Sequence, residues 1–444
     1  MTITPSKKIT LIISLGIFTE IFYLLFVFVN GDGNIPAYMF IYFEAFILFF
    51  AAWFVIKKAD SKSDVHFVSK FIKKIFKTDD HASARLSFPI LIILAGILFR
   101  VTLIPTAPAT SPDVYRYIWE GRTTVNGYNP YINTPDDPQL EHLRDDIYED
   151  VAFKHLPAIY PPFAQIIFAV SQFITPGSFL SLKIIFLLFE ILTMYFLLKL
   201  LLLKGMKPGL VLLYAWLPLP IMEYFVNAHI DVVGLSFLIM FIYYLEKGKI
   251  TLPAIFFALS FLTKLYPLML IPLLIKKIGL KKLLIFLIWF AGITFLFYLP
   301  FIYKDIYVTE SLVKYMQHWE FNASVYNLLK YFTNGQAARE ICAILLIISV
   351  ASIATRYTDF TRGVFGVFLA YIIFAATLYP WYLGWLAVLN PFAGFVSVIS
   401  LFFTANFSNF TPLGEVWREY FWVLLLQYIP FFGLLVYDFK KFKD

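Results

Sequence analysis

The stretch ATSPDVYRYIWEGRTTVNGYNPY, residues 109–131, interrupts an otherwise very apolar chain and directly follows a segment able to cross a bilayer. Its ionisable residues, four within ten positions, are Asp113, Arg116, Glu120 and Arg122, and its aromatic residues include Tyr115, Tyr117, Trp119, Tyr128 and Tyr131. Charges at the mouth of a membrane domain usually have a function. Aromatic faces stack on sugar rings and lie well at a lipid interface. We therefore interpret this stretch as part of a functional site rather than as a solvated loop.

The composition identifies the class of protein. Of the 444 residues, 60% are hydrophobic and 20% are aromatic, and the mean hydropathy is +0.76; a soluble domain is about 45–50% apolar. The sequence therefore predicts an all-α polytopic membrane protein. The formal charge of +7 comes from Lys and Arg clustered in short loops, which is the positive-inside pattern and argues against a nucleic-acid partner. The single cysteine, Cys342, excludes an internal disulfide and an all-cysteine metal site.

The distribution of apolar runs and basic residues predicts the topology. The run at residues 9–29 follows Lys7 and Lys8 and lacks a small-residue cleavage site, so we expect a retained first span with a cytoplasmic N-terminus. A second span at 37–56 leads to a basic segment, 57–87, which we expect to form a cytoplasmic amphipathic helix on the anionic leaflet. A third span, at 88–104, returns the chain to the outer side.

Two long polar loops are then expected outside, at about 105–160 and 302–338. Between them, the apolar run that ends at residue 174 is too short to span and is expected to be re-entrant or interfacial, and a break at 263–267 interrupts another apolar pair. The chain ends with Lys440, Lys441 and Lys443, which places the C-terminus in the cytoplasm. We predict one membrane-embedded domain, residues 1–444, with roughly 13–14 transmembrane or half-transmembrane helices and short surface helices in the first external loop.

The polar clusters all fall on the predicted external face, which is the main functional signal. They are the stretch from Asp113 to Arg122, then His155, His229 with Asp231, Lys264, His318 with Glu320, and the stretch from Tyr379 to Tyr382. A site facing away from the cytoplasm makes nucleotide sugars and ATP poor substrates. In agreement, the sequence has no Walker A run, no Rossmann glycine fingerprint and no Asp-x-Asp motif.

Several motifs together resemble a known family. They are SPDVYRYIWEGR at 111–122, GYNPY at 127–131, IYPP at 159–162, KLYP at 264–267 and PWY at 380–382. In this order and spacing they are similar to those of the bacterial multi-span glycosyltransferases of the GT-C class. More narrowly, they resemble the mannosyltransferase-like members related to the enzymes of glycolipid-anchor assembly.

The resemblance implies inverting transfer of one sugar from a polyprenyl-phosphate donor to an acceptor hydroxyl of a glycan or glycolipid, on the extracytoplasmic face. It favours mannose, and it implies that Asp113 is the catalytic base. A carboxylate near a low-dielectric wall has a raised proton affinity and suits this role. Because the leaving monophosphate is anionic, we expect cations near it; the candidates are Arg116, Arg122, Lys264 and His229. We expect contacts with the sugar or acceptor from Tyr115, Trp119, Glu120, Tyr160, Asp231, Trp381 and Tyr382.

Some alternatives stay open at this stage. Another sugar, such as arabinose or glucose, would need the same machinery, and a divalent cation such as Mg²⁺ or Mn²⁺ is neither required nor excluded by any spacing. From another class, a transporter or flippase would move a polyprenyl-linked sugar without chemistry, and should carry ionisable residues near mid-membrane on several spans. A structural membrane protein would not explain the one-sided clustering. The motif order favours a bacterial plasma membrane as the location.

Overall fold

The structure is a computed structural model that describes residues 5–58, 65, 69–70, 73, 80–302, 310–413 and 417–443. Its described residues form helices and no strands, apart from one isolated bridge between Phe321 and Thr377. The all-α class predicted from composition is confirmed, and the chain is a polytopic membrane protein. The predicted amphipathic helix at 57–87 falls largely outside the described residues.

Seven helices of the described chain are long and apolar enough to cross a membrane. They are α1 (Pro5–Asn30), α2 (Ile35–Lys58), α4 (Asp80–Leu103), α8 (Leu180–Leu203), α13 (Ile271–Tyr298), α16 (Gly335–Arg356) and α21 (Phe421–Lys443). An eighth candidate is a pair bent by 47°, η2 and α9 (Pro208–Ala215) followed by α10 (Pro218–Phe225). Shorter apolar helices are α7 (Pro162–Ile174), α12 (Thr251–Phe261), α17 (Phe360–Phe374) and α20 (Val396–Thr404).

The centre of the bundle is built from α10 and α11 (Asp231–Glu246). Every residue of α10 is buried, as are nearly all residues of α11, including its first residue, Asp231. A helix that is apolar on all sides is stable only inside a protein or a membrane. Around this centre, one hydrophobic cluster includes residues from Ile12 to Leu435, so helices from both ends of the chain share a core.

The helix α13 contains a break that explains its length. At Gly279 the backbone takes φ 74° and ψ 161°, which divides the helix at a kink. Glycine adopts this conformation without the steric cost that a side chain would add. Lys276, Lys277, Lys281 and Lys282 flank the kink.

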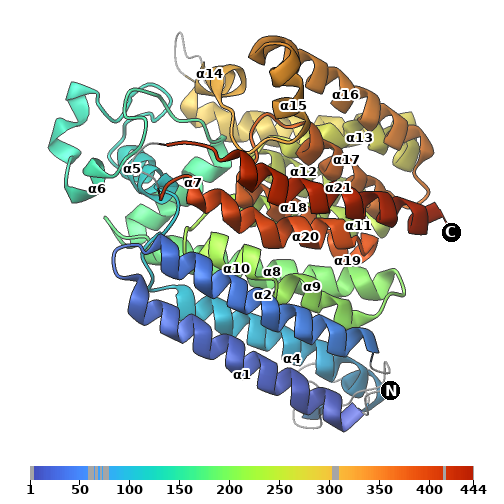
Figure 1. The fold of residues 1–444 in the computed structure, drawn as a ribbon. Helices are drawn as coiled ribbons and strands as arrows, with labels where there is room; N and C mark the ends of the chain where they lie inside the picture. Colours follow the sequence, from blue (N-terminus) through green and yellow to red (C-terminus); the bar gives the residue numbers. More distant parts are fainter. Residues whose placement is uncertain are drawn as a thin grey trace.

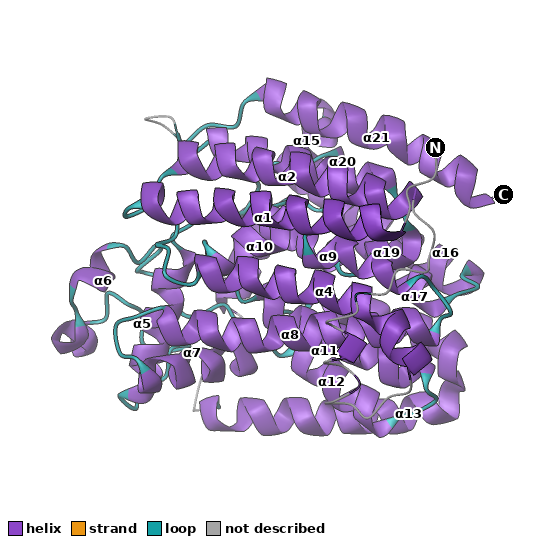
Figure 2. Ribbon diagram, turned by 90° about the horizontal axis from the view of Figure 1, so that it is seen from below, coloured by secondary structure: helices purple, strands orange, loops and turns teal. Residues whose placement is uncertain are grey.

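The two ends of the bundle differ in content (Figure 1). One end carries α5 (Asp113–Val125), α6 (Asp146–Glu149) and α14 (Glu310–His318), while the described chain ends lie at the other. Figure 2 shows the same separation from below. The predicted short helices of the first polar loop are α5, the 3-10 helix η1 (Pro138–Leu143) and α6. The second polar loop contributes α14 and α15 (Val325–Phe332).

Candidate functional site

A cavity of about 640 Å³ opens at the end of the bundle that carries α5 and α14. Its wall comes from segments far apart in sequence: the start of α5, residues 152–161, residues 264–266, α14 with the residues after it, residues 379–382, residues 408–412 and Trp417. The lining is rich in aromatic side chains, namely Tyr117, Phe153, Tyr160, Tyr266, Tyr315, Trp319, Phe321, Tyr379, Trp381, Tyr382 and Trp417. The cavity therefore offers ring faces of the kind that stack on sugars.

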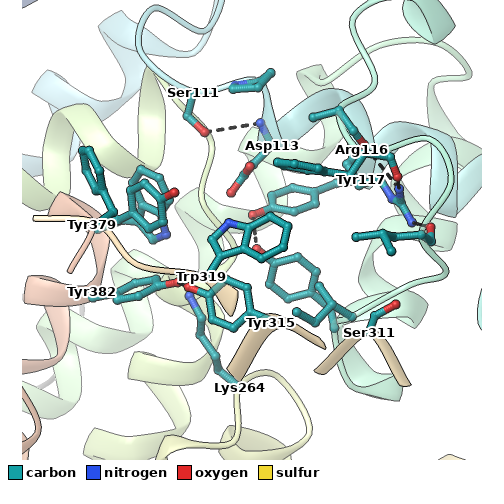
Figure 3. A pocket seen from close by; sticks show the side chains of 18 of the residues that line it. Ser111, Asp113, Arg116, Tyr117, Lys264, Ser311, Tyr315, Trp319, Tyr379 and Tyr382 are labelled. Atoms are coloured by element: carbon teal, nitrogen blue, oxygen red, sulfur yellow. Dashed lines mark hydrogen bonds between the residues drawn. The ribbon is translucent and has the colours of Figure 1, made fainter. Parts of the chain in front are cut away.

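Asp113 is the first residue of α5, and its carboxylate points into this cavity (Figure 3). Its backbone N–H donates to Ser111 Oγ at 3.3 Å. The position in the first helical turn places the carboxylate at the positive end of the helix dipole. The side chain is 34% exposed, and that exposed part faces the cavity. Asp113 can therefore meet a ligand directly.

The surroundings of Asp113 make its carboxylate more basic than usual. Burial raises the pKa of Asp113 to about 6, against the opposing effect of the positive charge of Lys264 and with a further increase from Asp231. The carboxylate is therefore mostly ionised at neutral pH, yet it holds a proton more tightly than an ordinary aspartate. This combination suits a general base.

Lys264 lies across the cavity from Asp113 (Figure 3). Its Nζ donates to both carboxylate oxygens of Asp231, at 2.8 and 2.7 Å, and lies 4.4 Å from the ring centroid of Tyr382. Asp231 is fully buried and also accepts a hydrogen bond from Trp385 Nε1 at 2.8 Å. Burial lowers the pKa of Lys264, while Asp231 opposes this and favours the charged form. The site therefore holds a cation that is fixed in position by a buried anion.

His229 lies behind Asp113 and does not line the cavity. Its ring stacks on Trp381 with centroids 3.6 Å apart; Nδ1 is 3.7 Å from Asp113 Oδ2, and Nε2 is 3.5 Å from Glu223 Oε2. Neither nitrogen has a hydrogen-bond partner among the described residues. Burial and the nearby charge of Lys264 hold the pKa of His229 well below its ordinary value, so the ring is neutral. The neutral ring packs against Trp381 and next to the carboxylate of Asp113, on the side away from the cavity.

Glu223 and Asn227 are buried next to the site, outside the cavity lining, and were not among the sequence-predicted site residues. Glu223 accepts hydrogen bonds from Tyr38 (2.8 Å) and from Asn227 Nδ2 (3.1 Å). The Oδ1 atom of Asn227 accepts from the backbone N–H groups of Ala109 and Thr110, at 3.1 and 3.0 Å. Asn227 thus anchors the segment that leads into α5. Their spacing of four residues in an apolar run is the sequence signal that could have identified them.

Arg116 and Glu120 line the cavity but are already engaged. Arg116 Nε donates to Glu120 Oε1 at 2.6 Å, and its terminal nitrogens donate to backbone carbonyls of residues 152, 153 and 156. The second carboxylate oxygen of Glu120 accepts from Gln165 Nε2 at 2.7 Å. This arrangement braces the first polar loop against α5 and α7.

Three other sequence-predicted residues lie away from the cavity lining. Arg122 binds both carboxylate oxygens of Asp145 at 2.7 Å and the carbonyl of Leu143 at 2.8 Å. Trp119 is buried in a cluster with Leu140 and Val151, and Tyr115 packs against the same cluster. These side chains hold the folded loop together.

The remaining aromatic candidates, Tyr160, Trp381 and Tyr382, do line the cavity. Tyr382 and Tyr315 share a hydrogen bond between their hydroxyls at 2.6 Å, which ties α14 to the 379–382 segment. Trp381 stacks between His229 and Tyr379. Sequence reasoning singled out neither Tyr315 nor Tyr379 as a ligand contact, because a tyrosine in an external loop has no distinctive pattern.

The donor set is poor in metal ligands. Among the described residues, no three or more His, Cys, Asp or Glu side chains gather closely enough to hold a metal ion. Both carboxylate oxygens of Glu120 are occupied by protein donors.

A protein-family model described as "Alpha-(1->6)-mannopyranosyltransferase, N-terminal domain" matches residues 19–278, more than half of the chain. The matched region includes Asp113, Asn227, Asp231 and Lys264. No curated protein and no solved structure matches the chain.

Proposed function

Since the chain belongs to the alpha-(1->6)-mannopyranosyltransferase family, we propose that it transfers one mannose from a polyprenyl-phosphate donor to an acceptor hydroxyl of a glycan or glycolipid. The observation that carries this proposal is the pair of opposite charges, Asp113 and Lys264, that face each other across an aromatic cavity. A transfer reaction needs both: a base for the acceptor and a cation for the leaving phosphate.

In the proposed step, the acceptor hydroxyl attacks the anomeric carbon as Asp113 takes its proton. The new bond joins the acceptor oxygen to this carbon, and the bond from the carbon to the phosphate oxygen breaks. The electron pair of the broken bond stays on the phosphate, which leaves as polyprenyl monophosphate. Attack opposite the leaving group inverts the anomeric configuration. The raised pKa of Asp113, about 6, favours the proton transfer.

Lys264 is the side chain that we assign to the leaving phosphate. It lines the cavity, whereas Arg122 does not. Lys264 Nζ bonds to one side chain, Asp231, whereas all three nitrogens of Arg116 are tied to Glu120 and to backbone carbonyls of the loop. An ammonium group that is largely buried stabilises developing negative charge more strongly than one in water. Asp231 orients Lys264 without entering the cavity lining. Tyr160, Trp381 and Tyr382 are the proposed faces for the sugar rings.

The competing transporter hypothesis expects ionisable residues on several spans, and buried ones do occur: Arg100 on α4, and Lys183 and Glu190 on α8. Their contacts and positions argue against a substrate path. Arg100 of α4 and Glu190 of α8 form a fully buried ion pair at 2.7 Å, and Tyr214 donates to the same carboxylate. Neither charged residue lines either of the two described cavities. A pair that is closed off in this way stabilises contacts between helices rather than a substrate path.

The decisive experiment is sugar transfer by the purified chain in liposomes, with labelled polyprenyl-phosphate-mannose and a mixed pool of glycolipid acceptors. The variant is Asp113→Asn, which keeps the shape of the side chain but removes the base; loss of a general base typically costs about 10²–10⁴-fold in rate. The control is Glu141→Gln, which changes an exposed carboxylate of the same loop. Equal transfer by Asp113→Asn and the native chain would reject Asp113 as the base. Translocation of the labelled lipid without transfer would reject the enzymatic function.

A further inference from the structure

A second cavity, of about 600 Å³, lies at the opposite end of the bundle from the Asp113 site. Its wall is formed by α16, α17, the connection between them, and aromatic residues from the start of α20 and the end of α21. Apart from this connection, the lining is largely apolar, with Ile348, Phe365, Leu369 and Phe439 among its residues. The family match ends at residue 278, before all of these helices. We call this cavity the α16–α17 groove.

The groove has the dimensions of one acyl chain. Its lining runs along α17 from Arg362 to Phe374, which is about 18 Å at the helical rise of 1.5 Å per residue. One leaflet of a bilayer has a hydrocarbon depth of about 15 Å. Gly366 and Ala370 line the groove, and their small side chains leave space along this face of α17. A Cβ at Gly366 would have Ile353 Cδ1 as its nearest atom, at 3.4 Å. A larger side chain at Gly366 would therefore fill the groove.

The mouth of the groove is basic. Arg356 ends α16 and Arg362 lies in the first turn of α17; both are exposed, and both line the groove. Arg362 Nε also donates to the carbonyl of Phe392 at 3.2 Å. Asp359 is the only acidic residue in its described lining, and its Oδ2 already pairs with Lys204 at 2.5 Å. Lys276 adds another positive charge at the same turn, where its Nζ donates to the carbonyls of Thr355 and Tyr357. Among the described residues, basic side chains outnumber acidic ones at the mouth, which favours an anion.

We propose that the α16–α17 groove binds one anionic phospholipid of the bilayer, with its phosphate at Arg356 and Arg362 and one acyl chain along α17. The two features together select this ligand. A zwitterionic lipid such as phosphatidylcholine carries a choline cation beside its phosphate and would gain less from the arginines, and a water-soluble anion would gain nothing from the apolar groove. Arginine also suits phosphate because its planar fork donates two parallel hydrogen bonds. The bound lipid covers apolar surface that the protein itself leaves open between α16 and α17.

The test is native mass spectrometry of the purified full chain in detergent, titrated with phosphatidylglycerol or with phosphatidylcholine. We expect one phosphatidylglycerol to be retained in preference to phosphatidylcholine. The double variant Arg356→Gln/Arg362→Gln should weaken this retention by roughly 10–30-fold, since each basic residue contributes to the binding of anionic lipid. The matched control is Lys441→Gln, which removes an exposed charge of α21 that does not line the groove.

A second variant keeps the test decisive if the double variant folds poorly. Gly366→Leu leaves both arginines in place but fills the groove, and it should lower retention of phosphatidylglycerol to the level of phosphatidylcholine. Equal retention of the two lipids by the native chain would overturn the proposal, as would unchanged selectivity in both variants. Preferential retention of polyprenyl phosphate over phosphatidylglycerol would also overturn the assignment to a bilayer phospholipid. None of these outcomes depends on mannose transfer.

Discussion

At the scale of single residues, the carboxylate of Asp113 is both accessible to a ligand and more basic than an ordinary aspartate. Its carboxylate is open to the cavity, while the protein around it raises its pKa to about 6. The proposed base must be ionised to accept a proton, and the ionised fraction falls as the pH drops below the pKa. We therefore predict that kcat/KM for transfer is half-maximal near pH 6 and falls about tenfold per pH unit below it.

This pH profile can be measured in liposomes between pH 4.5 and 8, with the internal and external buffers matched. A rate that stays constant down to pH 5 would contradict the assigned base. Glu141→Gln is the control variant. Its exposed carboxylate lies outside the cavity lining, so its pH profile should coincide with that of the native chain.

Substitutions of Lys264 and Asp231 can distinguish the contribution of this ion pair to stability from the contribution of Lys264 to the transfer rate. Lys264→Met removes the proposed phosphate ligand and leaves the buried Asp231 without its cation. Breaking a buried pair in this way costs about 3–5 kcal/mol of stability, and loss of a charge-stabilising donor costs about 10²–10³-fold in rate. The double variant Asp231→Asn/Lys264→Met should recover much of the stability without recovering transfer.

Thermal unfolding in detergent and the transfer assay together check this prediction. If the double variant regains both stability and activity, Lys264 has only a structural role. Lys264→Arg provides a further comparison, since it keeps the charge but changes the reach of the side chain. Partial activity in Lys264→Arg, with none in Lys264→Met, is the result we expect.

At the scale of elements, the contact between α5 and α7 positions Asp113. A Cβ on Gly121 would lie 2.4 Å from the carbonyl oxygen of Phe168 in α7. This distance is shorter than the van der Waals contact between a non-bonded carbon and oxygen. Gly121→Ala must therefore push α5 away from α7, and we expect a loss of about 1–3 kcal/mol in stability together with reduced transfer. Gly292→Ala is the matched control, because a Cβ there meets nothing within 4 Å.

The two glycine variants should have effects of opposite sign. In an exposed helix interior, alanine is more favourable than glycine by up to about 1 kcal/mol, so Gly292→Ala should raise the unfolding temperature slightly. Transfer activity should fall only in Gly121→Ala. Similar unfolding temperatures and rates for both variants would show that the close packing at Gly121 has no consequence for the site.

At the scale of the whole molecule, we infer that the chain acts as one membrane-embedded unit, because one core joins residues near both ends. The described chain ends lie at one end of the bundle, and the Asp113 cavity lies at the other. The lysines near both termini are expected to remain in the cytoplasm. We therefore predict that the cavity faces the extracytoplasmic side.

Thiol labelling tests this orientation on a favourable background, because the native Cys342 is buried, with 3% exposure. Glu141→Cys and Lys441→Cys place single thiols at exposed sites near the two ends of the bundle. A membrane-impermeant maleimide applied to intact cells should label Glu141→Cys, and should label Lys441→Cys only after permeabilisation. The reverse pattern would place the cavity in the cytoplasm.

The sequence alone was sufficient to determine the membrane class, and it drew attention to the loop around Asp113. Apolar runs of about 20 residues must form helices in a bilayer, since every backbone polar group needs a partner within the segment. The concentration of charge after the third span made Asp113 a candidate, and the motif KLYP made Lys264 another. These inferences depend on residues close together in the chain, so they required no knowledge of packing.

Only the tertiary structure decided which candidates line the cavity. Arg116 and Arg122 look equivalent in sequence, but their partners come from residues 143–156, whose positions depend on how the loop folds. His229 is neutral because it is buried against Trp381, 152 positions away in the chain. Burial and contacts between distant segments set the charge, pKa and orientation of a side chain, and these quantities arise only when the chain is packed.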